Sequence, residues 1–476
     1  MADIKVSRTY YNDQQMTDSN SLANAMLQRP AELSPVITFL GGRQDKKFPL
    51  TMLTEGMQNT KSIDEDEYEY KVQTKVTRTR PVAETPANSA NLGQGGQTFK
   101  LVFPDQWFIK DYVLVSQSGV QARVMRQPVP KGSNYEYTLQ LVNPNTNAYV
   151  PQKDVQAGAT WGQLFAPVGK DFSRGNASNW TAPSEVKHKL TKIRKSYQMS
   201  GDAKDYVMSV ELPTEGGGTS NLWMDYEEWQ HMLQWKEELE MLHWYGERSY
   251  NAQGETHLRD ENGQPIIIGP GIFQQIVNKD TYSVLTADKL HNTIGDLFFG
   301  MTDAQEVQVT LFTGTGGKRE FDRAMKDELA SGKFTVLDQG KFVQGQGQEL
   351  ELTGYFTSYR HIDGHLVNVV KNPLFDHGAV AQASEKHPVS GLPLESYRMV
   401  FLDQSIYNGE PNLQMVNKSN YEFKRWAVPG SVTPPGFDQS TSRASDIDGA
   451  SVHFMKQGSV CLKRFDTSLD LQCVRA

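Results

Sequence analysis

Hydrophobic and polar residues alternate with the period of a β-strand over several stretches of this chain. From Glu67 to Val76, tyrosine, valine and threonine alternate with glutamate, glutamine and lysine, as expected of a strand with one buried face. Shorter alternating runs, separated by Gly, Pro and Asn turn residues, recur within residues 99–165, and another run lies at Tyr206–Leu212. We therefore predict a strand near residue 70, a β-rich module and a further strand after it.

The period changes after Gly216-Gly217-Gly218, where apolar residues begin to recur every three or four positions. This is the period of an amphipathic helix. The apolar positions are Trp223, Tyr226, Trp229, Met232, Leu233, Trp235, Leu239, Leu242 and Tyr245. The polar side is expected to carry Glu227, Glu228, Glu237, Glu238 and Glu240. We predict a helix at residues 219–247, capped by Thr219 or Ser220, with a length on the order of 35 Å.

The rest of the chain predicts an α/β lobe and a β-rich C-terminal part. A strand at Val307–Leu311 is followed by a Gly-rich turn and a helix at Glu320–Ala330. Two more strands are expected at Leu366–Val370 and Tyr397–Leu402. A hairpin is expected at Ser451–Arg464, turning at Gln457-Gly458.

These patterns divide an α+β chain into seven expected parts. They are a polar N-terminal arm (1–60), a strand and flexible loop (61–98), an inserted β-rich module (99–165), extended-loop strands (166–218), the long helix (219–247), a mainly α/β lobe (248–395) and a β-rich C-terminal part (396–476). The arm and the strand edges expose more polar backbone and apolar surface than a monomer tolerates, so we expect copies of the chain to cover them.

Composition narrows the function. The 476 residues include 48 basic and 56 acidic side chains, a net charge of −8, which disfavours a broad cationic surface for nucleic acid or a polybasic membrane anchor. The two cysteines, Cys461 and Cys473, fit neither a redox pair nor a zinc site, and we expect both to be ordinary small buried residues. No signal-peptide core or membrane-length apolar run occurs, so we expect a soluble protein made in a cytosol.

Two motifs suggest chemistry. The stretch Thr313–Lys318 is Gly-rich, but Phe312 stands where a phosphate loop needs Gly, and Arg319 stands where it needs Ser or Thr. His361, Asp363 and His365 are the best metal candidates, although Asp363-Gly364 equally signals a hairpin turn. We favour turns in both places and predict no catalytic residue, no metal and no cofactor. A metal-dependent hydrolase using His361, Asp363 and His365 is the alternative from another class.

Two charged clusters are candidate assembly contacts. The acidic run comprises Asp64, Glu65, Asp66 and Glu67, and the basic cluster around His188 comprises Lys187, Lys189, Lys192, Arg194 and Lys195. Each cluster is either a solvated face or one half of a complementary contact between copies of the chain.

Several phrases of the sequence resemble the major capsid proteins of crAss-like phages of gut bacteria. They are Lys61–Val72 (KSIDEDEYEYKV), the helix end His243–Gly246, Gly269–Ile276 (GPGIFQQI), Val369–Phe375 (VVKNPLF) and Tyr397–Asp403 (YRMVFLD). The order of segments is also similar to the Hong Kong 97-type capsid fold of tailed bacteriophages, with its N-arm, extended loop, spine helix, axial lobe and peripheral lobe.

The resemblance implies a structural protein that self-assembles into the hexamers and pentamers of an icosahedral head. That head would enclose double-stranded DNA without sequence-specific binding and without a membrane. The implied location is the virion, after assembly in the host bacterial cytoplasm, and the implied partners are portal, scaffold and auxiliary or head-fibre proteins. A different virion component, of the tail or of a head fibre, is the alternative within the same class.

Overall fold

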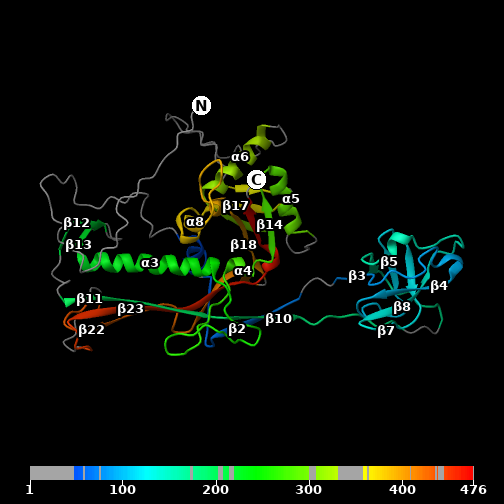
Figure 1. The fold of residues 1–476 in the computed structure, drawn as a ribbon, viewed down its shortest axis with the longest axis horizontal. Coiled ribbons are helices and arrows are strands. Elements are labelled where there is room, and N and C mark those ends of the chain that lie inside the picture. Colours follow the sequence, from blue (N-terminus) through cyan, green and yellow to red (C-terminus); the bar gives the residue numbers. More distant parts are fainter. Residues whose placement is uncertain are drawn as a thin grey trace. The chain divides into compact units, whose positions relative to one another are not determined.

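The computed structural model describes twelve stretches of the chain, which form two compact units. The described residues are 48–56, 59–73, 77–171, 175–201, 207–213, 219–299, 307–330, 358–361, 364–407, 409–434, 437 and 444–474. One unit is Tyr70–Val186, and the other contains the described residues before and after it (Figure 1).

A six-stranded mixed sheet forms one half of the larger unit. Its order is β14 (Asn278–Tyr282), β24 (Leu469–Cys473), β18 (Met399–Asp403), β15 (Gln308–Thr313), β17 (Leu366–Lys371) and β16 (Ser358–Arg360). Leu311 and Phe401 lie on the face covered by helices α5 (Ala287–Leu297) and α6 (Thr315–Ala330), while their neighbours Phe312 and Val400 pack on the other face. Because both faces are covered, β15 and β18 are almost continuously buried, and β15 keeps Thr310 and Thr313 among its apolar residues.

A five-stranded sheet forms the other half of this unit. It contains β1 (Thr60–Ile63), β21 (Leu413–Lys418), β23 (Gly449–Leu462), β11 (Thr191–Ser200) and β22 (Lys424–Pro429). The long strand β23 is central, because β11 pairs along one stretch of it and β21 and β22 pair with successive parts. Figure 1 shows β11, β22 and β23 running together below the long helix.

The predicted hairpin at Ser451–Arg464 is wrong, because residues 451–462 belong to one uninterrupted strand, β23. Gly458 pairs with Thr191 of β11 and with Asn417 of β21 instead of forming a turn. A Cβ added at Gly458 would overlap the Asn417 side-chain oxygen and lie 3.1 Å from the carbonyl oxygen of Val416. The glycine is therefore explained by the close approach of a neighbouring strand.

Helix α3 (Trp223–Tyr245) connects the two sheets. It starts at Trp223 and not at the predicted caps, because Thr219–Leu222 forms β13, which pairs with β12 (Val207–Pro213). Trp235 and Leu239 pack on Phe454 of the five-stranded sheet. One or two turns further on, the helix packs in a second core. At the start of the helix, the side chains of Trp223 and Tyr226 lie outside the described part of the structure.

Trp244 is the centre of that second core and was absent from the predicted apolar positions. Its ring lies 5.4 Å from Phe273, 5.3 Å from Phe312 and 5.3 Å from Phe375, measured between centroids. These rings come from the helix, the six-stranded sheet and the short helices α4 (Ile272–Gln275) and α7 (Leu374–His377). Aromatic packing at these distances fixes the helix to the sheet.

Glu240, predicted on the polar side of α3, is fully buried. Its carboxylate accepts hydrogen bonds from the backbone N–H groups of Leu50 (2.8 Å) and Thr51 (2.9 Å), from the Thr51 hydroxyl (2.6 Å) and from the Trp244 indole (3.0 Å). Burial raises the pKa of Glu240, and the hydrogen bonds oppose that rise. The carboxylate therefore holds the turns α2 (Pro49–Thr51) and η2 (Met52–Gly56) against α3.

The smaller unit, Tyr70–Val186, is built on a sheet that closes on itself. Its strand order is β3 (Thr79–Pro81), β9 (Thr160–Gln163), β5 (Val113–Ser116), β6 (Gln121–Val124), β8 (Asn134–Leu141) and β4 (Thr98–Phe103), with β7 (Val129–Lys131) also on β8. Just beyond β3, Ala83 donates to the carbonyl of Val102 in β4 at 2.7 Å, which joins the two ends of the sheet. Phe103, Tyr137 and Trp161 fill the interior.

This compact unit extends beyond both ends of the predicted module at residues 99–165, because β3 belongs to its sheet. The remaining elements are short. They are β2 (Glu67–Val72), β10 (Ser184–Lys189), β19 (Ile406–Tyr407), β20 (Glu410–Pro411), α8 (Ala379–Ala383) and the 3-10 turns η3 (Gln94–Gly96), η4 (Gln152–Asp154), η7 (Leu394–Tyr397) and η8 (Phe465–Thr467).

We predict that Glu240→Ala lowers the free energy of unfolding by about 3 kcal/mol, since buried donors lose their acceptor. Chemical denaturation monitored by tryptophan fluorescence measures the change. The control is Glu238→Ala, whose half-exposed carboxylate pairs with Lys195, and it should cost less than about 1 kcal/mol. Equal losses in the two variants would contradict this account of the buried carboxylate.

We predict that Gly458→Ala destabilises the protein by about 1–3 kcal/mol, because the added methyl group meets the neighbouring strand β21. The thermal unfolding midpoint is the readout. Gly169→Ala is the matched control, since no atom lies within 4 Å of a Cβ added there. A Gly458→Ala protein as stable as the control would mean that β23 is not continuous at this point.

Candidate functional site

The two predicted charged clusters meet within one chain on paired strands. Strands β2 and β10 form a two-stranded sheet (Figure 1). The Lys187 ammonium lies 3.3 Å from the Glu69 carboxylate, and that of Lys189 lies 4.0 Å from Glu67. Exposed pairs such as Lys187 with Glu69 contribute only ~0.2–1 kcal/mol each, so they order the strands weakly and leave their charges accessible.

The rest of the basic cluster lies on β11 and contacts aromatic and acidic groups of the same sheet and helix. Lys195 pairs with Glu238 of α3 at 2.5 Å. The Arg194 guanidinium lies 5.2 Å from the ring centre of Trp426, and the Lys192 ammonium lies 5.8 Å from that of Tyr421. Lys192, Arg194 and Lys195 therefore already interact with aromatic or acidic groups of the same subunit.

The acidic run forms the turn between β1 and β2. Asp66 accepts hydrogen bonds from Lys418 (2.5 Å) and from Gln457 (2.7 Å), and the Lys418 hydrogen bond holds the pKa of Asp66 below its usual value. Asp64 and Glu65 are exposed. On the acidic side Asp64 and Glu65, and on the basic side Lys187 and Lys192, thus have exposed side chains that a neighbouring copy could reach.

Strand edges are a second feature that needs a partner. Strand β11 pairs over its ten residues with β23 on one edge, and no described strand pairs with its other edge. Strands β14 and β16 end the six-stranded sheet in the same way. An open edge of this length is a template for pairing with another chain.

Large apolar side chains stand in solvent on both units, and sequence periodicity did not identify them. The larger unit exposes Phe299 (86%) and Val389 (87%), and the smaller exposes Trp180 (84%) and Phe165 (56%). The backbone beside Trp180 is fixed, because the Asn179 amide donates to the Trp107 carbonyl at 2.6 Å. The sequence feature that could have identified Trp180 is a lone aromatic residue in a loop rich in Asn, Ser and Pro. Apolar side chains scattered singly are common on protein surfaces, so each of these is a candidate for contact with a neighbouring copy and no more than that.

The metal candidates occupy a β-hairpin. Strands β16 and β17 are antiparallel, His361 donates its backbone N–H to the carbonyl of His365 at 2.8 Å, and Gly364 has a φ of 91°, which confirms the predicted turn. The His361 ring stacks on His291 at 4.3 Å. Asp363 lies outside the described residues, and the described residues contain no group of three or more His, Cys, Asp or Glu that could hold a metal.

The Gly-rich stretch Thr313–Lys318 runs into the first turn of α6, which begins at Thr315, and protein groups fill the space around it. The carboxylate of Asp376 accepts hydrogen bonds from the backbone N–H (2.7 Å) and hydroxyl (2.6 Å) of Thr315 and from Ser396 (2.7 Å). Although burial opposes ionisation, these hydrogen bonds hold the pKa of Asp376 below its usual value. A Cβ at Gly316 would lie 2.7 Å from the Tyr397 ring. The turn therefore caps a helix with a carboxylate, as the failed phosphate-loop spacing indicated.

Both cysteines are free thiols. Cys461 is buried, and burial raises the pKa of its thiol to about 11. Cys473 is partly buried at the end of β24. Within the described stretches, no helix combines the length and the apolar character needed to cross a membrane.

The known proteins to which this chain is similar in sequence are phage major capsid proteins. Residues 8–475 match the family model described as Crassvirus major capsid protein. The major capsid protein of Bacteroides phage crAss001 is 25% identical over 430 residues, which cover 84% of each chain.

Solved structures with weak similarity include two capsids. One is the capsid of Cyanophage P-SCSP1u, with a TM-score of 0.32, 10% identity, and coverage of 66% of this chain and 81% of that chain. The other is the capsid of a native GTA particle, with a TM-score of 0.33, 8% identity, and coverage of 97% and 100%. TM-scores this low do not establish a shared fold, so the fold of this chain is defined by its own strand orders.

The buried histidine of the β10 strand gives a prediction about pH. His188 packs edge-on against Tyr68 at 5.5 Å, and burial, with a smaller effect of Arg248, lowers the pKa of His188 to about 4. Between about pH 6.5 and pH 4 the unfolded chain therefore binds a proton that the folded chain does not, so stability falls as pH falls through this window.

When the pH is lowered from about 7.5 to about 5, we expect the free energy of unfolding to fall less in His188→Phe than in the wild type. The difference between the two decreases should be up to ~2 kcal/mol. Denaturant unfolding at the two pH values measures the difference. His257→Phe, at an exposed position, is the control and should behave like the wild type. An identical pH dependence in all three proteins would show that His188 is not buried in its neutral form.

Proposed function

The chain belongs to the Crassvirus major capsid protein family, and on that premise we propose how its parts build the capsid of a crAss-like phage. A major capsid protein is a structural component of the virion and not an enzyme. Family membership therefore selects the shell over the alternatives of a tail or head-fibre component and a metal-dependent hydrolase.

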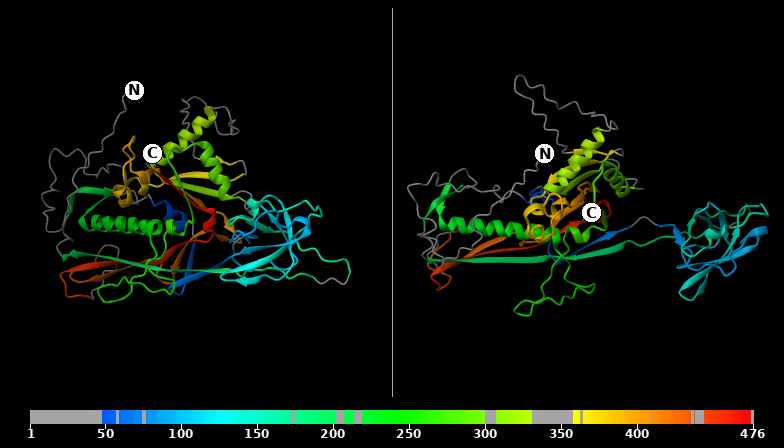
Figure 2. Two further views of the ribbon diagram at one scale, coloured as in Figure 1. Left: turned by 45° about the vertical axis from the view of Figure 1, so that its right-hand side comes forward. Right: turned by 45° about the horizontal axis from the view of Figure 1, so that its top comes forward.

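We assign the parts of the Hong Kong 97-type fold as follows. Helix α3 is the spine, the five-stranded sheet is the peripheral lobe, and the six-stranded sheet with α5 and α6 is the axial lobe. Strands β2 and β10 are the base of the extended loop, and the unit Tyr70–Val186 is the inserted module. The observation that supports this assignment is helix α3, drawn in green in both views of Figure 2, whose middle part (Trp235 and Leu239) and C-terminal end (Trp244) pack in two different cores.

The shell is proposed to consist of hexamers and pentamers that form an icosahedral head around double-stranded DNA. Portal, scaffold and auxiliary or head-fibre proteins are the proposed partners, and assembly is proposed to take place in the host bacterial cytoplasm. A net charge of −8 suits a wall that must not adhere to packed DNA.

Neighbouring copies are proposed to meet through the exposed part of the charged clusters. Asp64 and Glu65 of one copy face Lys187 and Lys192 of the next, because these side chains remain exposed after the pairing within the subunit. The open edges of β11 and β14 and the exposed Phe299 and Val389 supply the apolar and backbone part of the contacts.

The first test is expression of the full chain alone, followed by negative-stain electron microscopy. We expect closed shells or capsomers, because the uncovered edges require other copies. Trimeric rods, or monomers at high concentration, would contradict the proposal.

The contact itself is tested by charge reversal in trans. Asp64→Lys/Glu65→Lys and Lys187→Glu/Lys192→Glu should each reduce the yield of shells at least about fivefold, since like charges then face each other. Co-expression of the two variants should restore shells, because opposite charges meet again between copies. Lys326→Glu, in an exposed pair with Asp322 on α6, is the control and should assemble normally. Normal assembly of both double variants, or no recovery on mixing, would exclude this contact.

A further inference from the structure

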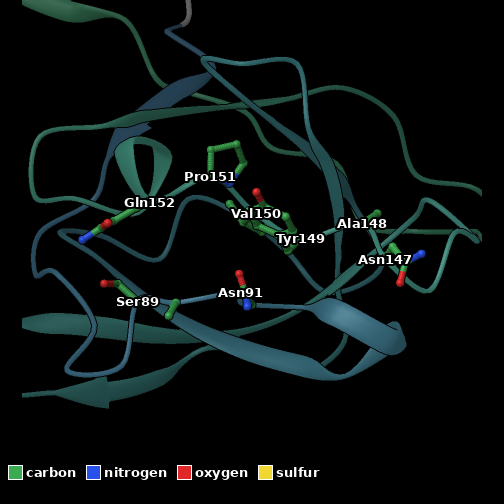
Figure 3. A pocket seen from close by; sticks show the side chains of 9 residues that line it. Ser89, Asn91, Asn147, Ala148, Tyr149, Val150, Pro151 and Gln152 are labelled. Atoms are coloured by element: carbon green, nitrogen blue, oxygen red, sulfur yellow. The ribbon is translucent and has the colours of Figure 1, made fainter.

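The smaller unit carries a hollow that the shell-building role does not use. It has a volume of about 530 Å³ and is lined by residues 89–91 and 147–152 (Figure 3). This volume lies within the range of ~300–1,000 Å³ that is typical of small-molecule sites. Figure 3 shows Ser89 and Asn91 on one side of the hollow and Tyr149, Val150 and Pro151 on the other.

The two loops around the hollow are held by backbone hydrogen bonds and by the core. Val150 donates its N–H to the carbonyl of Leu92 at 2.9 Å, and Gly95 donates to the carbonyl of Thr146 at 3.0 Å. The Val150 side chain is fully buried in the core of the unit. The hollow is therefore shaped before any ligand arrives, which lowers the entropic cost of binding.

The side chains that line the hollow are neutral, and several are polar. The nine lining residues include no Asp, Glu, Lys, Arg or His. The polar side chains among them are Ser89, Asn91, Asn147, Tyr149 and Gln152. None of these side chains forms a hydrogen bond with any other residue that the structure describes. Tyr149 is half exposed, with 50% of its surface accessible. Three amides, two hydroxyls and one accessible aromatic ring are thus available to a ligand.

We propose that this hollow binds a neutral carbohydrate. An amide offers both a donor and an acceptor, which matches neighbouring hydroxyl groups on a sugar ring. The face of Tyr149 offers an apolar surface for the C–H face of the same ring. The absence of charged groups among the lining residues gives no attraction for a phosphate, a carboxylate or a metal ion.

A peptide is a poorer match for the same surface. Peptides that add to a sheet edge need unpaired backbone groups. Here the backbone N–H of Val150 is already bonded to Leu92. The hollow is also open to solvent and small, so the affinity of one site is expected to be weak, on the order of millimolar. Many copies on one shell would raise the apparent affinity through multivalency.

The test is an array of neutral oligosaccharides of glucose, galactose, mannose and N-acetylglucosamine, incubated with assembled full-length protein. The wild type should bind at least one of these sugars. Tyr149→Ala and Asn147→Asp should each weaken that binding at least tenfold, the first by removing the ring and the second by placing a charge in a neutral site. Trp180→Ala is the matched control, because Trp180 is an exposed aromatic residue of the same unit outside the hollow, and it should bind like the wild type.

Circular dichroism and electron microscopy establish that each variant is folded and assembled, and Asn147→Asp keeps the loop nearly isosteric if Tyr149→Ala is unstable. No binding to any neutral sugar at millimolar concentration would overturn the proposal. So would binding that survives both substitutions, binding that Trp180→Ala abolishes equally, or capture of a peptide at the hollow in place of a sugar.

Discussion

The larger unit depends on one short segment of helix α3, from Trp235 to Trp244. Within these residues the helix packs on the five-stranded sheet, holds the α2 turn through Glu240 and enters the aromatic core beneath the six-stranded sheet. A buried carboxylate with four hydrogen-bond donors is stable only if every donor is in place. The segment therefore couples three parts of the chain, because moving any one of them would leave polar groups buried and unpaired.

This coupling explains how the larger unit can have a packed interior and still leave strand edges and apolar side chains uncovered. The interior of the larger unit is filled and its buried carboxylates are bonded, as Glu240 and Asp376 show. Its edges are not finished, because β11 and β14 have open sides and Phe299 stands in solvent. A member of a capsid family needs this combination, since a preformed body presents fixed surfaces to its neighbours and those surfaces gain from being covered.

Sequence patterns predicted the elements whose period is set locally. The strands β15 and β18 lie close to where the patterns placed them, and the turn at Gly364 follows from its own residues. Helix α6 ends at the predicted Ala330 but begins five residues before the predicted Glu320, at Thr315. The patterns failed where a distant partner decides the role of a residue. The pattern places Glu240 on the polar surface, because Leu50 and Thr51, whose backbone N–H groups it accepts from, lie about 190 positions earlier.

The same reason explains the error at Gly458 and the pairing within one chain that the sequence did not predict for the charged clusters. A glycine in a strand satisfies a close approach from a neighbouring strand, but its sequence context is that of a turn. Lys187 and Glu69 pair within one chain because β2 and β10 lie side by side, which their separation in sequence did not indicate. The function class was predicted from the resemblance of several sequence phrases to crAss-like phage capsid proteins, and the family match confirms it.

Hydrogen–deuterium exchange on the unassembled subunit and on the shell tests the central claim most directly. If the α3 segment preforms the larger unit, the backbone amides of Leu50 and Thr51 are protected in both states, because their acceptor is Glu240 of the same chain. Amides on the open edge of β11 should gain protection only in the shell. Rapid exchange at Leu50 and Thr51 in the free subunit, with protection appearing only on assembly, would contradict the account.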